Sequence, residues 1–207
     1  MKTKSGSLDV WESWEHRFSD LRRILDLGSG EHRGFSLKTR ARIVLVDVQT
    51  RFHPDVAADA QVLPFKPGSF DGALAVSVLE HVPRPWDAVR EIHRVLQPGG
   101  VVLGYVPFMW PYHADVSFHD YYRFSDEGVR ALFRQFESIQ TIPSGGYTNT
   151  LFRFSAGFTA SQRHLQRLER ITSLTLAGLA RATGIWGTTR VNGLLRSATG
   201  FNFLAQR

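Results

Sequence analysis

The seven residues Ile-Leu-Asp-Leu-Gly-Ser-Gly at positions 24–30 constrain the fold more than any other part of the chain. A short apolar run closed by glycines is typical of a buried parallel strand followed by a tight turn. Gly28 and Gly30 permit the turn and let a ligand approach the backbone, because no Cβ stands in the way. The segment therefore predicts an α/β fold with a nucleoside site at its first strand end.

A second apolar run, residues 43–46, ends in Asp47, which lies 21 residues after Asp26. At about this spacing, the end of a second strand presents a carboxylate to the ribose hydroxyls of a nucleoside. A turn that binds a dinucleotide would carry a small residue at the position where this chain has Arg33. The negative charge of Glu31 in the same turn would repel a diphosphate but attract a cation. A cationic nucleoside without phosphates therefore fits better than NAD, and no Gly-Lys-Ser/Thr follows to make a P-loop.

Several segments, in order, resemble the class I S-adenosylmethionine-dependent methyltransferases, in particular the small single-domain (type 11-like) branch that acts mostly on small molecules. Residues 26–30 resemble the methionine-binding turn, and residues 59–65 resemble the adenine-binding segment. Residues 77–82 follow the fourth strand, and Pro-Gly-Gly at 98–100 precedes the fifth. The resemblance covers residues 24–106. It implies a Rossmann-like, seven-stranded, mostly parallel sheet with an antiparallel last strand and helices on both faces.

The same resemblance implies S-adenosyl-L-methionine as the cofactor and gives its binding residues. They are Asp26, Gly28, Ser29, Gly30, Asp47, Val48, Asp59, Ala60 and Ser77. An acid after a strand is often only a helix cap, and Ser77 could line the pocket through its backbone alone. We favour cofactor binding for the acids, because three strand-end carboxylates at one edge of a parallel sheet fall where such sheets bind ligands.

The chain is expected to form a single methyltransferase domain, residues 1–207, since 43% apolar residues can bury one sizeable core. Residues 1–22 are expected to form a lid helix whose tryptophans pack rather than bind substrate, and residues 23–146 the cofactor-binding core. Residues 147–198 are interpreted as a basic helical insertion, which departs from the family pattern. Residues 199–207 then hold the last strand, with Phe201–Gln206 as the only good candidate.

Charge is unevenly distributed along the chain. Residues 1–150 carry 17 Lys and Arg against 18 Asp and Glu, whereas residues 151–207 carry 8 against 1. The predicted helix at 159–182 sets an Arg stripe beside a Leu stripe, a pattern that suits an acidic acceptor or an anionic membrane surface. The alternatives are a substrate lid or a homodimer surface whose arginines are solvated.

Composition also bears on compartment and chemistry. The absence of cysteine excludes disulfides, thiolate metal sites and a cysteine nucleophile. No run approaches the ~18 apolar residues of a membrane span, and the first seven residues do not resemble a secretory leader. A cytoplasmic protein, peripheral to a membrane if the basic helix binds one, is the expectation.

Catalysis of methyl transfer mainly requires a nucleophile to be held close and stripped of water, with a base only for a protonated acceptor. His119 or His113, in the loop after the fifth strand, is the predicted general base. The predicted substrate contacts are His81, Trp110, Asp120, Tyr121, Tyr122 and Arg123. The alternative is that His119, Asp120 and Arg123 form a hydrogen-bonded network that only holds the loop, and that His81 is a pocket wall.

A metal site is not expected. His113, Asp115 and His119 are ligand-type residues, but they lie in a loop rich in proline and aromatic residues. Their two histidines lack the i, i+4 spacing of a zinc-binding helix.

The leading function is methylation of a small molecule, and we favour O-methylation of a sugar, a lipid-linked intermediate or a specialised metabolite. A nucleic-acid methyltransferase using the basic C-terminal segment is the second interpretation. It is disfavoured because the fourth strand is followed by Ser-Val-Leu-Glu at 77–80, not the Asn/Asp-Pro-Pro-aromatic run of DNA amino-methylating enzymes. The third interpretation is a non-catalytic partner protein that binds the cofactor. A nicotinamide oxidoreductase is disfavoured by Arg33.

Overall fold

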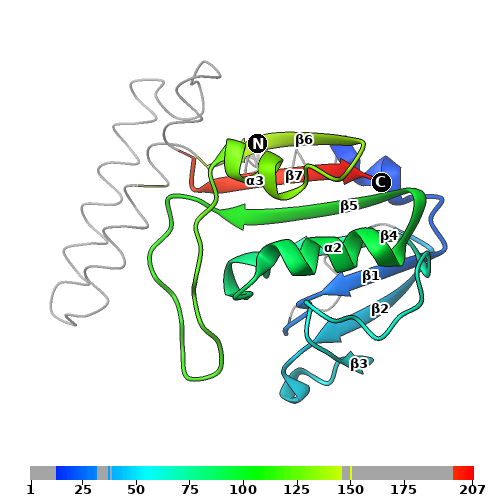
Figure 1. The fold of residues 1–207 in the computed structure, drawn as a ribbon, viewed down its shortest axis with the longest axis horizontal. Helices are drawn as coiled ribbons and strands as arrows, with labels where there is room; N and C mark the ends of the chain where they lie inside the picture. Colours follow the sequence, from blue (N-terminus) through cyan, green and yellow to red (C-terminus); the bar gives the residue numbers. More distant parts are fainter. Residues whose placement is uncertain (1–12, 32–36, 38, 146–149, 151–197) are drawn as a thin grey trace, which may run out of the picture.

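The computed structural model describes residues 13–31, 37, 39–145, 150 and 198–207. Within this part of the chain, seven strands form one sheet in the order β3-β2-β1-β4-β5-β7-β6 (Figure 1). The strands are β1 (Arg23–Leu27), β2 (Arg42–Asp47), β3 (Val56–Ala57), β4 (Phe70–Val76), β5 (Leu96–Pro107), β6 (Ser138–Ser144) and β7 (Gly200–Gln206). The helices that lie wholly within the described residues are α2 (Pro85–Val95) and α3 (Asp126–Leu132), with 3₁₀ turns η1 (His16–Phe18), η2 (Thr50–Phe52) and η3 (Leu79–His81).

Strand direction follows the predicted fold. The pairs β2–β3, β1–β2, β1–β4 and β4–β5 are parallel, whereas β7 runs antiparallel to both β5 and β6. The predicted last strand at Phe201–Gln206 is confirmed, with one more residue at its start. The Rossmann-like sheet with an antiparallel last strand is therefore present, and its parallel strands end on a common edge.

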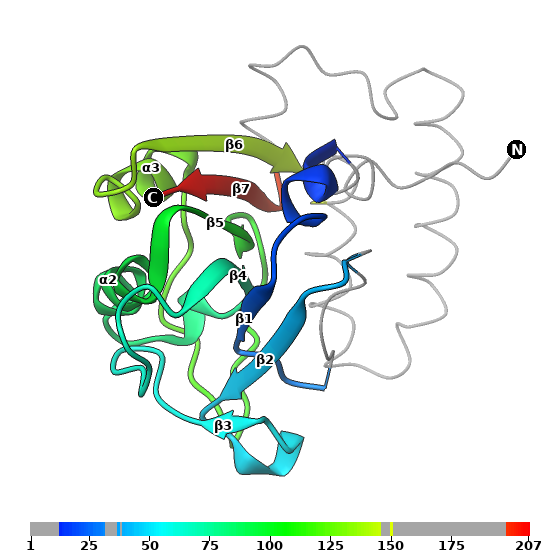
Figure 2. The ribbon, with the colours of Figure 1, turned by 90° about the vertical axis from the view of Figure 1, so that its right-hand side faces the viewer.

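Helices and the N-terminal segment cover opposite faces of the sheet. Figure 2 shows α2 and α3 on one side and the N-terminal segment, in blue, on the other. Apolar residues of α2, among them Val89 and Ile92, are fully buried in the larger core cluster. Trp14 and Phe18 pack with Leu74 in a smaller cluster against the opposite face. Trp14 therefore packs, as expected.

Local sequence signals explain both helices. Pro85 begins α2, where its missing N–H costs nothing, and an apolar stripe of that helix faces the sheet. Ser125 caps α3, because its side chain accepts a hydrogen bond from the Gly128 N–H at 3.1 Å.

One strand differs from expectation. The sequence predicted a fifth strand from Val101, whereas β5 begins at Leu96, which pairs with Phe70. The register then shifts, so that Val101 pairs with Gly72, and the intervening Pro-Gly-Gly forms an irregularity within the strand, with Gly99 at φ +78°. Pro-Gly-Gly, which was expected to precede the strand, thus lies within it.

Two predictions lie outside the described residues. These are the basic helix at 159–182, with most of the 147–198 insertion, and the part of the lid helix before residue 13. Within the described part of the chain, no helix combines the length and apolar character needed to cross a bilayer.

Candidate functional site

A cavity of about 440 Å³ opens at the carboxyl ends of β1, β2 and β4. Seven of the nine predicted cofactor-binding residues line it: Gly28, Gly30, Asp47, Val48, Asp59, Ala60 and Ser77. Asp26 and Ser29 do not line the cavity and are buried. The described residues 13–22 do not line it either, so the predicted lid function of the N-terminal helix stays a prediction.

The glycine turn after β1 is built for close approach. Gly28 adopts φ +67°, and a Cβ at this position would lie 2.4 Å from Cγ2 of Val78. The Gly28 N–H donates to the Val46 carbonyl at 2.8 Å, which ties the turn to the end of β2. Glycine is required here both for its conformation and for its lack of a side chain.

Asp47 is held at the cavity by two backbone groups. Its Oδ2 accepts a hydrogen bond from the Gly30 N–H at 3.0 Å, and its Oδ1 accepts one from the Gln49 N–H at 2.8 Å. The residue is only 8% exposed. The carboxylate is therefore oriented before any ligand arrives, and each of its oxygens retains acceptor capacity.

Side chains of α2 hold the segment that follows Asp59 by hydrogen bonds. Glu91 accepts a hydrogen bond from the Leu63 N–H at 2.8 Å, while Arg94 donates to the carbonyls of Leu63 and Phe65. The Arg94 hydrogen bond also holds the pKa of Glu91 below its ordinary value. This charged pair positions the predicted adenine-binding segment at the cavity wall.

Ser77 marks the end of β4 with an unusual backbone. Its φ is +50°, a left-handed conformation that residues other than glycine seldom adopt. Its N–H donates to the Tyr105 carbonyl at 2.9 Å, which holds the conformation. Such backbone conformations cluster at functional sites, and Ser77 indeed lines the cavity.

The loop between β5 and α3 is held by a network centred on Asp120. The Asp120 side chain is fully shielded from solvent and pairs with Arg123, whose Nη2 donates at 2.7 Å. Arg123 also donates to the carbonyls of Trp110 and Pro111, and the His113 N–H donates to Asp120. The Arg123 hydrogen bond lowers the pKa of Asp120 to about 2.

The sequence predicted, as an alternative to catalysis, a hydrogen-bonded network of His119, Asp120 and Arg123 that holds the loop. The observed network resembles it, but contains His113 in place of His119. Asp120, Arg123 and His113 take part in it as side chains. His119 contributes only its carbonyl, which lies 2.6 Å from Nδ1 of His81. The His119 ring is exposed and belongs to the cavity lining.

His81 has a defined orientation. Because a carbonyl can only accept, the 2.6 Å contact means that Nδ1 of His81 carries the proton and Nε2 holds the lone pair. Burial lowers the pKa of His81 below its ordinary value, so the ring is neutral near pH 7. The ring lines the cavity and packs edge-on against Phe118.

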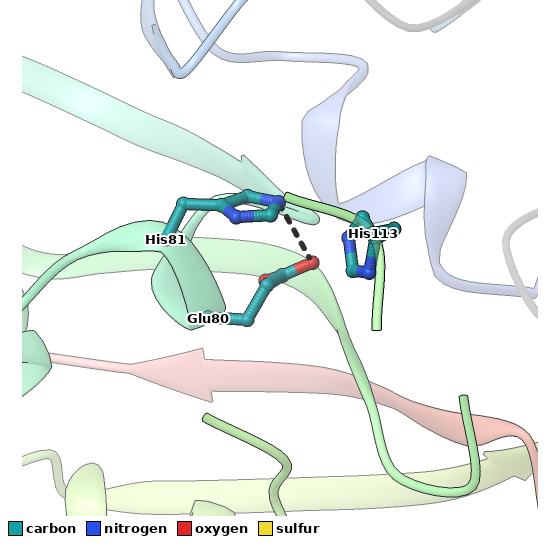
Figure 3. Close-up of side chains that lie close together, drawn as sticks. All are labelled: Glu80, His81 and His113. Carbon is teal, nitrogen blue, oxygen red and sulfur yellow. Dashed lines mark ion pairs between the residues drawn. The ribbon is translucent and has the colours of Figure 1, made fainter. Parts of the chain in front are cut away.

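Glu80 is the residue that sequence reasoning passed over. Its side chain is 1% exposed, and its Oε1 lies 3.8 Å from Nε2 of His81 (Figure 3). Among the residues that the structure describes, its Oε2 has no hydrogen-bond partner. Burial raises the pKa of the Glu80 carboxyl to about 8. An acid next to a histidine, with Val78 and Leu79 before them and Val82 after, was the sequence signal that could have drawn attention to it.

Of the predicted catalytic and substrate-binding residues, some line the cavity and others do not. His81, His119 and Tyr121 line the cavity, whereas His113, Trp110, Asp120, Tyr122 and Arg123 lie outside its lining. Sequence reasoning also missed several residues that do line it: Gln49, Phe52, Ser117 and Phe118. Arg51 donates to the Ser117 hydroxyl at 2.7 Å and so ties the β5–α3 loop to η2.

The comparisons with known proteins agree with this geometry. Residues 25–104 match the family described as Methyltransferase domain. The chain is similar to an uncharacterized methyltransferase of Mycobacterium sp. (strain KMS), with 30% identity over 161 residues. That stretch covers 72% of this chain and 63% of the relative, so the match spans less than two thirds of the relative's length.

Solved structures share the fold. A SAM-dependent methyltransferase from Archaeoglobus fulgidus gives a TM-score of 0.60 at 12% identity, over 96% of this chain and 92% of that one. The [4+2]-cyclase SpnF gives 0.57 at 18% identity, over 96% and 80%. With its ordered motifs, its sheet and its strand-end cavity, the chain belongs to the class I S-adenosylmethionine-dependent methyltransferases.

Proposed function

We propose that this protein transfers the methyl group of S-adenosyl-L-methionine to an oxygen of a small molecule bound in the strand-end cavity. The observation that carries the proposal is the cavity lining itself. Asp47, Asp59 and the Gly28–Gly30 turn share one cavity with two side chains of the β5–α3 loop, His119 and Tyr121. A cofactor and an acceptor can therefore meet in the same cavity.

The residues present fit the cofactor. The free acceptor capacity of the Asp47 carboxylate suits two ribose hydroxyls, and the open backbone at Gly28 and Gly30 suits the amino-acid portion. Asp59 accepts hydrogen bonds from Gln61 and stays exposed at the cavity wall, where it can accept from an exocyclic amine. When bound, the cofactor supplies an electrophilic methyl group on a sulfonium centre.

We assign the acceptor to the part of the cavity formed by the β5–α3 loop. Phe118 and Tyr121 of this loop line the cavity together with the exposed residue His119. These rings suit a ring-shaped acceptor and exclude water from its nucleophilic atom. We therefore favour a sugar, a lipid-linked intermediate or a specialised metabolite, methylated on a hydroxyl.

Proton removal falls to His119 in this proposal. As the acceptor oxygen forms its bond to the methyl carbon, the bond from that carbon to sulfur breaks, and the hydroxyl proton passes to the imidazole. His119 lines the cavity, whereas the His113 ring is engaged with Asp120 at 3.1 Å outside it. His119 is accordingly the better candidate of the two predicted bases.

The first test is calorimetric titration with S-adenosylmethionine, S-adenosylhomocysteine and NADH. We expect micromolar binding of the two adenosyl ligands and none of NADH. Asp47→Ala should weaken adenosyl binding by ~100-fold, since hydrogen bonds to charged groups contribute ~1.5–3 kcal/mol each. Glu127→Ala removes an exposed acid of α3 and is the matched control.

The second test is turnover. Acceptors carrying hydroxyl groups on sugar, polyprenyl-linked or aromatic scaffolds would be screened by the formation of S-adenosylhomocysteine. His119→Gln should then lower kcat while cofactor affinity stays unchanged. Adenosyl binding without methylation of any small acceptor, but with methylation of nucleic acid, would contradict the proposal. Binding with no methyl transfer at all would favour the partner-protein function.

A further inference from the structure

Three side chains with metal-binding atoms converge beside the cavity. Glu80 and His81 project from η3, and His113 comes from the β5–α3 loop (Figure 3). One potential ligand atom from each residue lies within 4.8 Å of those of the other two. This cluster differs from the set of ligand-type residues in the loop sequence, which was His113, Asp115 and His119. Two residues are neighbours in η3, and the third is more than thirty positions away in the chain.

The carboxylate of this cluster lacks a complete set of partners. Glu80 is buried, and its Oε2 accepts no hydrogen bond within the described structure. Buried polar atoms are almost always paired, so an unpaired carboxylate oxygen calls for a missing partner. Arg123 is an unsuitable partner, because its guanidinium is already paired with Asp120 and with three loop carbonyls.

Both histidines are oriented by oxygen acceptors, as metal-binding histidines usually are. Nδ1 of His81 lies 2.6 Å from the His119 carbonyl, which leaves Nε2, on the side facing Glu80, with its lone pair. Nδ1 of His113 lies 3.1 Å from Oδ2 of Asp120. A carboxylate or carbonyl behind an imidazole fixes the ring and raises its basicity as a ligand.

We propose that Glu80, His81 and His113 form a binding site for a divalent zinc ion. Two imidazoles and one carboxylate are ligands that Zn²⁺ prefers over the all-oxygen sets of Mg²⁺ and Ca²⁺. The 3.8 Å between Oε1 of Glu80 and Nε2 of His81 is close to the separation of two ligands on one zinc ion. A small inward shift of the partly exposed His113 ring closes the set.

The site has a direct structural consequence. A bound ion would join η3 to the β5–α3 loop, which already meets η3 through the hydrogen bonds of the Tyr121 and Tyr122 N–H groups to the Glu80 carbonyl. Three protein ligands leave one position for water. Because His81 also lines the cavity, a bound ion would lie next to the space assigned to the acceptor.

The test uses the full chain, freed of metal with a chelator and studied without cofactor or acceptor. Its result is thus independent of methyl transfer. We expect one Zn²⁺ per chain by calorimetry, and one Co²⁺ with the visible absorption of a four-coordinate ion. Glu80→Gln, His81→Ala and His113→Ala should each weaken binding by ~100-fold. His53→Ala, which removes an exposed histidine outside the cluster, should leave binding unchanged.

A second measurement needs no variant. Zn²⁺ should protect His81 and His113, but not His53, from acylation by diethyl pyrocarbonate, as read from peptide masses. This result decides the matter if a variant fails to fold. Zinc binding that survives both His81→Ala and His113→Ala with unchanged affinity would overturn the proposal. So would equal acylation of all three histidines with and without zinc.

Discussion

The raised pKa of the buried Glu80 carboxyl can be tested through the pH dependence of protein stability. Its side chain is 1% exposed, and burial raises its pKa from 4.5 to about 8. Between these values the folded protein holds a proton that the unfolded chain has released. The free energy of unfolding must therefore fall as the pH rises across this range, and level off above about pH 8.

The size of the effect follows from the two pKa values. Each pH unit between them removes ~1.4 kcal/mol of stability, so a rise from about pH 5 to about pH 8 removes ~4 kcal/mol through this one group. Glu80→Gln keeps the shape of the side chain but cannot ionise. We expect the variant to be less stable than or equal to the wild type near pH 5 and more stable near pH 8.

Urea denaturation at both pH values, with a chelator present to exclude metal, measures this difference. Glu127→Gln serves as the control, because Glu127 is an exposed acid on α3. Titration of other groups is common to all three proteins and cancels in the comparison. If the wild type and Glu80→Gln lost stability in parallel between the two pH values, Glu80 would not be protonated in the folded protein over this range, and the reasoning would fail.

Three further predictions concern the turn, the core and the loop. Gly28→Ala should abolish measurable adenosyl binding in calorimetry and lower stability by ~1–3 kcal/mol, because the new Cβ would lie 2.4 Å from Val78 at a positive φ. Phe203→Ala should cost ~3–5 kcal/mol in urea denaturation, since this ring is fully buried and packs against the ring of Phe133. Asp120→Asn should cost up to ~2 kcal/mol near neutral pH. Its deficit should vanish as the pH falls from about 4 to about 2, because the Arg123 pair lowers the pKa of Asp120 to about 2; a deficit unchanged over that range would contradict the pairing.

The cofactor edge of the sheet could be predicted because its signals are local. The turn at Gly28 and the acid at Asp47 each follow an apolar run directly, and parallel strands bring such ends together. Seven of the nine predicted residues therefore share one cavity. The bulge that lets β5 begin at Leu96 was missed, because Pro-Gly-Gly signals a turn whether it precedes a strand or interrupts one.

The loop after β5 could not be predicted at the same level. Its sequence shows which side chains are polar, but not which of them meet η3. The exchange of His113 for His119 in the network around Asp120 depends on how the loop folds back. Glu80 escaped notice for the same reason. Its burial results from packing under that loop, a tertiary contact that no periodicity in residues 78–82 reveals.

The position of β7 has a consequence for how this sheet comes together. β7 follows β5 and β6 in the chain, yet it lies between them and pairs with both. Until residues 200–206 arrive, β5 and β6 each present an open edge to the solvent and to other chains. The pairing with β5 also closes a separation of roughly a hundred residues, which slows folding. A polypeptide interrupted before Gly200 would thus carry two unpaired strand edges and be prone to aggregate.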